Sequence, residues 1–424
     1  MNTAELKSII QEQEKERNTT LKNENIIERD VNTKKLERFL KYPNALAILG
    51  IRRCGKSILS HMIMRGKKYG YINFDDEALY GIDTKDLNIV LKAFYDLYGD
   101  LDYLVFDEIQ NVIGWELFIN RLRRTKRIII TGSNSQLLSG ELATHLTGRH
   151  IDFLLFPFSF KEICRYKNIE IEKNEIYTTK TAARMEKLLI EYIKCGGLPE
   201  SYKYGKSIVK SIFSDIVIKD IAQRHNLKTS VIESLAKYLI TNSSNEISFN
   251  KLKNIFSIKK IETIKNYVKY FENAYLIFIL ERFSFKLKSQ LIAPKKIYCM
   301  DTGIINSISF RFSDNVGKMY ENAVCIELVR KRNKNNNEIF YWKDYQQNEV
   351  DFLIKKGTKI EQLIQVCYDI SNADTKKRET NSLLKASKEL KCKNMLIITE
   401  DYENEERVGG KKIKFIPLWK WLLS

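Results

Sequence analysis

The sequence is poor in the two residues that most often interrupt regular structure. Its 424 residues include only 5 prolines and 18 glycines, so most of the chain is expected to form helices and strands. Apolar residues make up 44% and charged residues 29%, a globular balance that excludes a wholly disordered chain. At ~100–200 residues per domain, this length predicts two to four domains.

Long apolar runs and paired cysteines are also missing. The longest apolar run, residues 274–280, is far shorter than the ~18 residues of a membrane-spanning helix. The beginning, MNTAELKSIIQEQEKER, is charged and unlike a signal or transit peptide. The 7 cysteines form no C-x-x-C pair and the 4 histidines no metal-spaced cluster, which disfavours structural zinc and a disulfide scaffold. We therefore expect a soluble cytoplasmic protein with free thiols and no membrane partner.

Negative charge is in short supply. Lys and Arg total 71 against 53 Asp and Glu, which gives a formal net charge of +18. Such a surplus suits an anionic partner, such as nucleic acid or an acidic membrane surface. A solvated lysine-rich surface explains the number nearly as well, because net charge names no partner.

The first 165 residues alternate short apolar strands with helical stretches. Residues 1–40 predict a helical lead-in, and residues 41–165 carry the alternation. The expected strands are 45–50, 69–76, 102–108, 126–135 and 149–160. Helical patterns connect them, and this βαβ succession predicts an α/β domain with a doubly wound parallel sheet.

Three further segments are predicted after residue 165. A helical connector covers 166–226, where CGGLPE marks a turn. Residues 227–288 show helices followed by a β-rich segment, the pattern of a winged helix-turn-helix. Residues 289–424 mix strands and helices in a further α/β domain, with KRNKNNNE (331–338) expected as a polar loop.

Residues 50–57, GIRRCGKS, match the phosphate-loop pattern G-x-x-x-x-G-K-[ST], the Walker A motif. Its glycines let backbone N–H groups surround phosphates at a helix N-terminus. Lys56 is expected to reach the β- and γ-phosphates of ATP and Ser57 to ligate Mg²⁺. An apolar strand precedes the motif and a helix follows, which is the context this chemistry requires. The expected nucleotide-binding residues are Gly50, Arg52, Arg53, Cys54, Gly55, Lys56, Ser57 and Ile58.

A second catalytic element, of the Walker B type, is predicted in LVFDE at 104–108. An apolar strand carries acids at its end, where Asp107 is expected to hold Mg²⁺ together with Ser57. Glu108 then lies where a general base polarises the attacking water. An acidic strand end before a turn is the alternative, which the phosphate loop makes the weaker one.

Two roles remain open for each of the other polar residues of this region. Asn134 or Ser133, at a strand end, is expected to sense the γ-phosphate or the water, and an N-cap for the next helix is an equal alternative. Arg149 is a candidate arginine finger, acting in cis or across an oligomer interface. Arg52 and Arg53 either add charge to the loop or pair with neighbours.

Cys54 carries a separate expectation because it lies inside the phosphate loop. Neighbouring Lys and Arg charges and the helix N-terminus predict a lowered pKa for its thiol. Thiol reagents are then expected to block ATP binding.

Seven motifs, taken together, resemble one known family. They are GIRRCGKS, LVFDEIQ, TGSNSQLLSG, LTGR, FPFSFKEI, GGLPE and EVDF. This combination resembles the prokaryotic AAA+ ATPases that end in a PD-(D/E)xK nuclease-like domain, over nearly the whole chain from about residue 28. The resemblance implies an ASCE-type P-loop sheet, a winged-helix middle domain, ATP hydrolysis and DNA involvement.

The C-terminal segment departs from the PD-(D/E)xK pattern. Such a site needs an acid on a helix, an Asp on a strand and Glu-x-Lys on the next strand. Glu321 or Glu327 supplies the first and EVD at 349–351 the second, but the third reads QVC at 365–367. A neutral amide is a poor Mg²⁺ ligand and a thiol cannot replace an ammonium, so nuclease activity is not expected. A solvated strand edge explains the acids at 349–351 better, and rescue by Lys355, Lys356, Lys376 or Lys377 is disfavoured.

Three functions remain open at this point. The first is a Mg-dependent AAA+ ATPase that couples its nucleotide state to DNA or a protein partner, with a homo-oligomer as an open alternative to a protein partner. The second is an ATP-controlled DNA nuclease. The third is a non-hydrolysing, nucleotide-dependent DNA-binding regulator, which the complete set of Lys56, Ser57, Asp107 and Glu108 disfavours. The sequence shows no guanine-reading N/T-K-x-D signature, which favours ATP.

Overall fold

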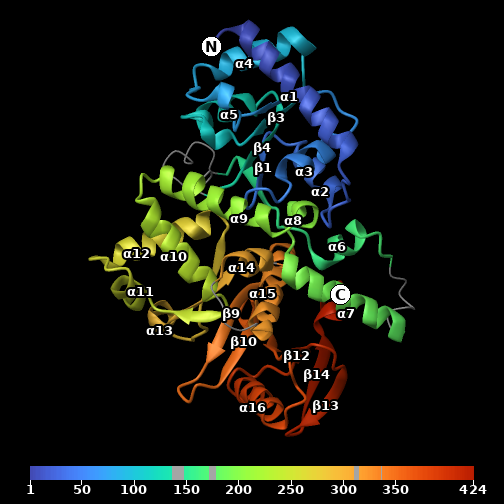
Figure 1. Cartoon of the computed structure of the whole chain (residues 1–424), viewed down its shortest axis with the longest axis vertical. Helices are drawn as coiled ribbons and strands as arrows, with labels where there is room; N and C mark the ends of the chain where they lie inside the picture. Colours follow the sequence, from blue (N-terminus) through green and yellow to red (C-terminus); the bar gives the residue numbers. More distant parts are fainter. Residues whose placement is uncertain (136–147, 171–177, 310–314, 336) are drawn as a thin grey trace. The chain divides into compact units, whose positions relative to one another are not determined.

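The computed structural model in Figure 1 describes residues 1–135, 148–170, 178–309, 315–335 and 337–424. The chain forms two compact units, which we describe separately. The first comprises Met1–Phe156 and Asn273–Tyr275, and the second comprises Pro157–Glu272 and Leu276–Ser424. In the described residues, no helix has both the length and the apolar character needed to cross a membrane.

A five-stranded parallel sheet forms the centre of the first unit, in the order β2-β3-β4-β1-β5. Its strands are β1 (Ala45–Leu49), β2 (Tyr69–Asn73), β3 (Tyr103–Asp107), β4 (Arg127–Gly132) and β5 (His150–Leu154). The central strands β1, β3 and β4 are buried almost throughout. Continuous apolar runs suit such strands because a parallel sheet has both faces covered. The predicted parallel α/β fold is confirmed.

Helices of the first unit include the predicted lead-in. They are α1 (Thr3–Asn23), α2 (Thr33–Phe39), α3 (Lys56–Ile63), α4 (Leu87–Tyr98) and α5 (Trp115–Leu122), with single turns at Glu77–Leu79 and Ile109–Asn111. Helix α1 lies beside α4 and β2 and buries Leu6 and Ile10 (Figure 1). The Gln13 side chain bonds both backbone polar groups of Asn73 at the end of β2. Helix α1 therefore belongs to the core of this unit.

The second unit begins with helices, and the turn between two of them bonds the buried carboxylate of Asp301. They are α6 (Phe160–Tyr166), α7 (Thr179–Cys195), α8 (Pro199–Tyr204), α9 (Lys206–Asp215) and a π-helical segment, Ile216–Gln223. Between α7 and α8, the backbone N–H of Gly197 donates to Asp301 at 2.6 Å. A Cβ at Gly197 would lie 2.2 Å from the carbonyl oxygen of Phe158. The glycine of the GGLPE turn is therefore required by close backbone approach.

A small antiparallel sheet follows, in the order β6-β8-β7. The elements are α10 (Thr229–Thr241), β6 (Asn245–Ile247), α11 (Phe249–Ile255), α12 (Ile261–Asn273), β7 (Ile277–Leu280), α13 (Leu287–Ile292) and β8 (Lys295–Cys299). This succession is compatible with a winged helix-turn-helix, which stays a prediction. Strand β8 pairs with β6 and β7 although it lies beyond the boundary expected at residue 288.

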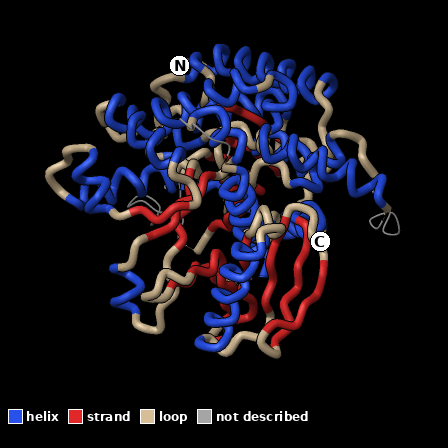
Figure 2. Tube along the Cα trace, turned by 60° about the horizontal axis from the view of Figure 1, so that its bottom comes forward, coloured by secondary structure: helices blue, strands red, loops and turns tan. Residues whose placement is uncertain are grey.

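The C-terminal part contains a six-stranded mixed sheet, in the order β13-β14-β12-β11-β10-β9. Its strands are β9 (Glu338–Lys343), β10 (Glu349–Lys356), β11 (Lys359–Val366), β12 (Met395–Thr399), β13 (Asn404–Val408) and β14 (Lys411–Pro417). The helices are α14 (Thr302–Ile308), α15 (Val316–Asn335), α16 (Ala373–Glu389) and α17 (Leu418–Leu423). Figure 2 shows neighbouring strands side by side near the C-terminus. The α/β character is confirmed, but the loop expected at 331–338 is wrong, because α15 continues to Asn335.

Candidate functional site

The phosphate loop lies at the carboxyl end of β1, directly before α3. A Cβ at Gly50 would lie 2.3 Å from the carbonyl oxygen of Leu155, so a larger residue cannot enter there. Gly55 has a φ of 96°, in the left-handed region that favours glycine. The two glycines are thus needed for different reasons, one for space and one for backbone conformation.

A buried arginine from outside the motif supports this loop. Arg29 donates from Nη1 to the carbonyl oxygen of Cys54 at 3.0 Å and from Nη2 to that of Phe156 at 2.7 Å. It therefore joins the loop to the end of the fifth strand. Sequence reasoning missed Arg29, because it belongs to no motif and lies 25 residues before its partner in the loop.

Lys56 is buried and forms an ion pair with Glu108. Its Nζ lies 3.1 Å from Oε1 of Glu108 and 3.4 Å from the carbonyl oxygens of Gly50 and Ile51. Burial opposes the charged form, but the Glu108 carboxylate outweighs it and raises the pKa of Lys56 above its ordinary value. Lys56 thus stays an ammonium over the mouth of the loop.

Asp107 ends β3 and is surrounded by hydroxyl donors. Tyr71 donates to its Oδ2 at 2.8 Å, and the hydroxyls of Thr131 and Ser57 also bond its carboxylate. Burial raises the pKa of Asp107, and the three hydroxyl groups oppose this rise. Sequence reasoning placed Asp107 and Ser57 here but not Tyr71 or Thr131, whose strands pair next to β3 only in the folded sheet.

Glu108 turns the chain sharply after β3. Its φ of 49° is uncommon for a residue other than glycine, and its N–H donates to Oγ1 of Thr131 at 2.9 Å. Gln110 donates to the other carboxylate oxygen. Burial favours the neutral acid, but the Lys56 ammonium holds the pKa of Glu108 below its usual value. This turn aims the carboxylate at the phosphate loop.

Asn134 and Ser133 follow β4 at the same edge of the sheet as Asp107, because β3 and β4 are parallel neighbours. Both side chains are buried. Within the described residues, the Ser133 hydroxyl has no hydrogen-bond partner. The segment that either residue would cap, from residue 136 onward, lies outside the described residues, so the N-cap alternative also stays a prediction. The sensor role therefore stays a prediction.

The other residues of the loop differ in exposure. Arg52 is half-buried and pairs with Asp75 at 3.1 Å, whereas Arg53 is exposed and has a φ of 63°. Ile58 is half-buried in the first turn of α3. The pairing of Arg52 agrees with one of the two roles expected for it.

The expectation for Cys54 is wrong. Its side chain is fully buried, and its Sγ donates to the carbonyl oxygen of Leu155 at 3.5 Å. Burial raises the pKa of the thiol, and the opposing effects of Lys56 and Arg29 are smaller. Cys54 therefore packs beneath the loop as a neutral thiol.

Arg149 is not brought to this site within one chain. Its carbonyl oxygen accepts from the N–H of Ala45 at the start of β1, and its Nη1 donates to Asn120 at 3.3 Å. The phosphate loop follows the other end of β1, five residues away at ~3.3 Å per residue. An arginine finger in cis is therefore not supported, and action across an oligomer interface stays a prediction.

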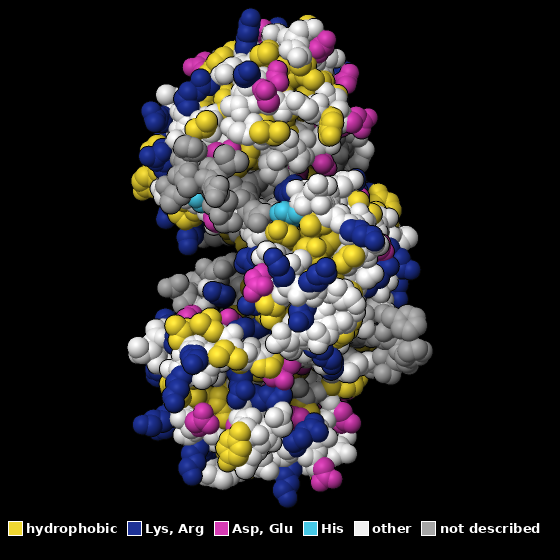
Figure 3. Space-filling model, turned by 90° about the vertical axis from the view of Figure 1, so that its left-hand side faces the viewer, with side chains coloured by type: hydrophobic (Ala, Val, Ile, Leu, Met, Phe, Trp, Pro, Cys, Tyr) yellow, Lys and Arg dark blue, Asp and Glu magenta, His cyan; other side chains and the backbone are white. Residues whose placement is uncertain are grey.

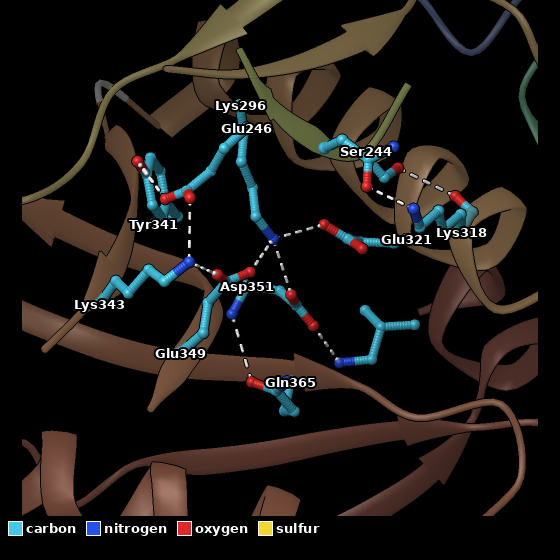
Figure 4. A network of polar contacts seen from close by, with 12 residues as sticks. Ser244, Glu246, Lys296, Lys318, Glu321, Tyr341, Lys343, Glu349, Asp351 and Gln365 are labelled. Carbon is cyan, nitrogen blue, oxygen red and sulfur yellow. Dashed lines mark hydrogen bonds and ion pairs between the residues drawn. The ribbon is translucent and has the colours of Figure 1, made fainter. Parts of the chain in front are cut away.

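The second unit holds a separate cluster of charged side chains, drawn in Figure 4. The Lys296 Nζ lies 2.8 Å from Glu321, 2.6 Å from Glu349 and 3.0 Å from Asp351. The strand-edge explanation of Glu349 and Asp351 is wrong, because β10 lies inside the sheet between β9 and β11. Asp351 is buried and Glu349 half-buried.

The alternatives left open for this cluster are now decided. Glu321 joins it, whereas Glu327 pairs with Arg330 at 2.9 Å. Of the lysines considered for rescue, Lys355 pairs with Glu338 and Lys376 with Glu406. Lys296 was missed, because it precedes its partners by 25 to 55 residues and belongs to another sheet.

Three family models match successive parts of the chain. Residues 42–164 match an AAA domain, 186–315 a domain of unknown function (DUF8612) and 316–421 a further domain of unknown function (DUF4143). The five-stranded parallel sheet, the phosphate loop after β1 and the AAA match together define the N-terminal region as an AAA-type P-loop ATPase domain.

Similarity to curated proteins extends over nearly the full chain. The chain belongs to the family of the uncharacterized protein MJ1544 of Methanocaldococcus jannaschii, with 38% identity over 419 residues, 94% of this chain and 91% of the relative. An uncharacterized protein of Haemophilus influenzae is 29% identical over 395 residues, 88% of this chain and 93% of that protein. Among solved structures, the Walker-type ATPase paby2304 of Pyrococcus abyssi aligns with a TM-score of 0.43 and 16% identity, over 68% of this chain and 97% of that one.

Proposed function

We propose that the protein binds ATP and hydrolyses it in a Mg²⁺-dependent reaction at the phosphate loop. One observation carries this proposal. Lys56, Ser57, Asp107 and Glu108 come from two separate motifs, yet their side chains converge at the carboxyl end of the sheet. Each supplies a group that phosphoryl transfer to water requires: an ammonium, a hydroxyl, a buried carboxylate and a second carboxylate as base.

The oxygen atoms of Ser57 and Asp107 fit a Mg²⁺ ion. A hydroxyl and a carboxylate are hard ligands, and the two already bond one another. Tyr71 and Thr131 donate to Asp107 and fix its orientation. When bound, Mg²⁺ would neutralise phosphate charge.

The ion pair between Lys56 and Glu108 makes ATP binding precede the activation of the base. Lys56 and Glu108 lie 3.1 Å apart, so each neutralises the other. An incoming triphosphate attracts Lys56 more strongly than a single carboxylate does, so Lys56 turns to the phosphates. Glu108 then loses its ammonium partner, its pKa rises, and it becomes a better proton acceptor for water. Glu108 is therefore free of its ion pair with Lys56, and able to act as a base, only when ATP is bound.

Coupling to DNA is the second part of the proposal. Lys259, Lys260, Lys265 and Lys269, on or just before α12, are all exposed, whereas Ile264, Val268 and Phe271 are buried. This division of the helix faces supports the proposal, because exposed lysines can contact phosphates, although Lys269 also pairs with Glu272 at 3.7 Å. Figure 3 shows Lys and Arg spread over the visible face, not gathered in one patch, so net charge alone does not locate the DNA surface.

The last residue of α12, Asn273, contacts the residue that follows the expected γ-phosphate sensor. Asn273–Tyr275 belong to the first unit, where the Ser135 hydroxyl donates to Oδ1 of Asn273 at 3.0 Å. Ser135 directly follows Asn134, the expected γ-phosphate sensor.

Phosphate release with Mg²⁺ and ATP, measured with and without duplex DNA, tests this proposal. We expect release that EDTA abolishes, that Lys56→Ala reduces through weaker nucleotide binding, and that DNA alters. ATP binding without any release would instead support the non-hydrolysing regulator. Release that DNA leaves unchanged would restrict the proposal to ATP hydrolysis.

A further inference from the structure

A buried ammonium lies at the centre of the charged cluster in the second unit. The Lys296 side chain is 3% exposed, and its Nζ contacts one carboxylate oxygen each of Glu321, Glu349 and Asp351 within 3.0 Å (Figure 4). Three elements supply these partners: β8 carries the lysine, α15 carries Glu321, and β10 carries the other two acids.

The carboxylate oxygens are already engaged by groups of the chain. Oδ2 of Asp351 accepts the backbone N–H of Val366 at 3.0 Å while Oδ1 faces Lys296. Oε2 of Glu349 lies 3.2 Å from Lys343, and Oε1 of Glu321 accepts the Tyr298 hydroxyl at 2.7 Å. Each acid therefore has an ammonium contact and a second donor.

The neighbouring strand β11 contributes the neutral amide of Gln365 to the cluster and no carboxylate. Oε1 of Gln365 accepts the backbone N–H of Asp351 at 3.2 Å, and its Nε2 donates to Glu379 at 2.7 Å. The amide is thus held in one orientation by the groups on both sides. Its oxygen is occupied by a backbone donor, so it is not presented to a metal ion.

A PD-(D/E)xK-like domain implies a divalent metal at these acids, but the residues present do not fit one. The position among the three carboxylates holds an ammonium, and in the described residues no group of three or more His, Cys, Asp or Glu side chains has an arrangement suited to a metal ion. Bringing a second cation to the same oxygens would place two like charges together in a buried site.

We propose that Lys296 is the resident cation of this cluster and stands in place of a divalent metal. The cluster then joins β8 of the small sheet to β10 of the large sheet and to helix α15, and it does so without a metal ion. A second ion pair extends the junction, because Lys343 on β9 also contacts Glu246 on β6 at 2.9 Å. The charged cluster thus holds the two sheets together.

Mn²⁺ binding to the full-length, nucleotide-free chain tests this proposal by loss of the free Mn²⁺ electron paramagnetic resonance signal. We compare the wild type with Lys296→Met, which has a similar length but no charge. Wild-type Mn²⁺ uptake is expected to be unchanged by Asp351→Asn. Lys296→Met is expected to gain a saturable Mn²⁺ site that the double variant Lys296→Met with Asp351→Asn lacks, and Mn²⁺ is expected to raise its melting temperature.

Lys295→Met is the matched control. Lys295 neighbours Lys296 on β8 and is also buried, but it pairs with Glu281 at 2.9 Å, outside the cluster. It is expected to gain no Mn²⁺ site. Lys296→Arg, which keeps the charge, is expected to behave like the wild type.

Three results would overturn the proposal: wild-type Mn²⁺ binding that Asp351→Asn abolishes, a folded Lys296→Met variant without the new site, or DNA cleavage by the wild type that depends on Asp351. If Lys296→Met fails to fold, the comparison of the wild type with Asp351→Asn decides the question. Equal Mn²⁺ uptake by these two proteins supports the resident ammonium, and unequal uptake refutes it.

Discussion

At the scale of single residues, the ion pair between Lys56 and Glu108 joins the expected phosphate-binding group to the proposed base. The Lys56 Nζ and the Glu108 carboxylate are 3.1 Å apart and largely buried, so neither is solvated well alone. The left-handed backbone of Glu108 holds this approach.

Glu108→Gln is expected to lower phosphate release by ~10²–10⁴-fold, the usual contribution of a general base. ATP binding is expected to persist or tighten, because Lys56 loses its anionic partner while Ser57 and Asp107 are unchanged. Phosphate release and binding of a fluorescent ATP analogue measure the two effects. Glu77→Gln, an exposed glutamate in the first unit, is the control. Equal turnover in the wild type and Glu108→Gln would contradict the assignment of the base.

At the scale of elements, α12 exposes its lysine side chains to solvent, whereas the GGLPE turn directs a backbone N–H group to a buried carboxylate. Helix α12 separates exposed lysines from a buried apolar stripe. The turn between α7 and α8 instead brings backbone N–H groups to the buried carboxylate of Asp301, which also caps α14.

The lysines of α12 predict salt-dependent DNA binding. Lys260→Glu with Lys265→Glu is expected to weaken DNA binding and to flatten its salt dependence, by ~0.9 in log–log slope for each lost phosphate contact. Fluorescence anisotropy with a labelled duplex at several salt concentrations measures both quantities. The charge-matched control is Lys412→Glu with Lys414→Glu on the exposed face of β14. If both double variants lose affinity equally, net charge rather than α12 is responsible.

Asp301 predicts a pH dependence of stability. Burial raises its pKa from 3.8 to about 6, although backbone N–H groups of Gly197, Leu198, Gly303 and Ile304 oppose the shift. Between these two values the folded state binds more protons than the unfolded state, so the contribution of Asp301 falls as pH rises from 3.8 to about 6.

The comparison with Asp301→Asn, which does not titrate, isolates this contribution. The melting temperature of the wild type relative to the variant is expected to increase as pH falls from neutrality towards pH 4. Thermal unfolding of both proteins in parallel buffers measures the difference. A difference that stays constant with pH would show that Asp301 keeps an ordinary pKa.

At the scale of the whole molecule, the position of Arg149 predicts cooperation between copies of the chain. Arg149 lies at the edge of the sheet opposite the phosphate loop, so an arginine finger must come from a second copy. Arg149→Ala and Lys56→Ala are each expected to hydrolyse ATP slowly, and mixing them is expected to restore part of the activity. Phosphate release over a range of mixing ratios measures the effect. Activity that equals the sum of the separate proteins at every ratio would exclude a finger in trans.

Much of the first unit was predictable because its signals are local. The central strands of the parallel sheet are short apolar runs, and the two candidate acids, Asp107 and Glu108, stand at the end of one of them. Strand ends on one side of a parallel sheet meet at one edge, so motif order alone placed Lys56, Asp107 and Glu108 together. Tyr71, Thr131 and Arg29 were not predictable, since their roles depend on which strands and segments become neighbours.

The sequence by itself determined the parallel α/β fold of the first unit and the phosphate loop with its acids. All of these depend on spacing within a few residues. Only the tertiary structure decided the burial of Cys54, the separation of Arg149 from the loop and the place of Lys296 among three carboxylates. Those features depend on solvent exclusion and on charges brought together from distant segments, which neither composition nor periodicity records.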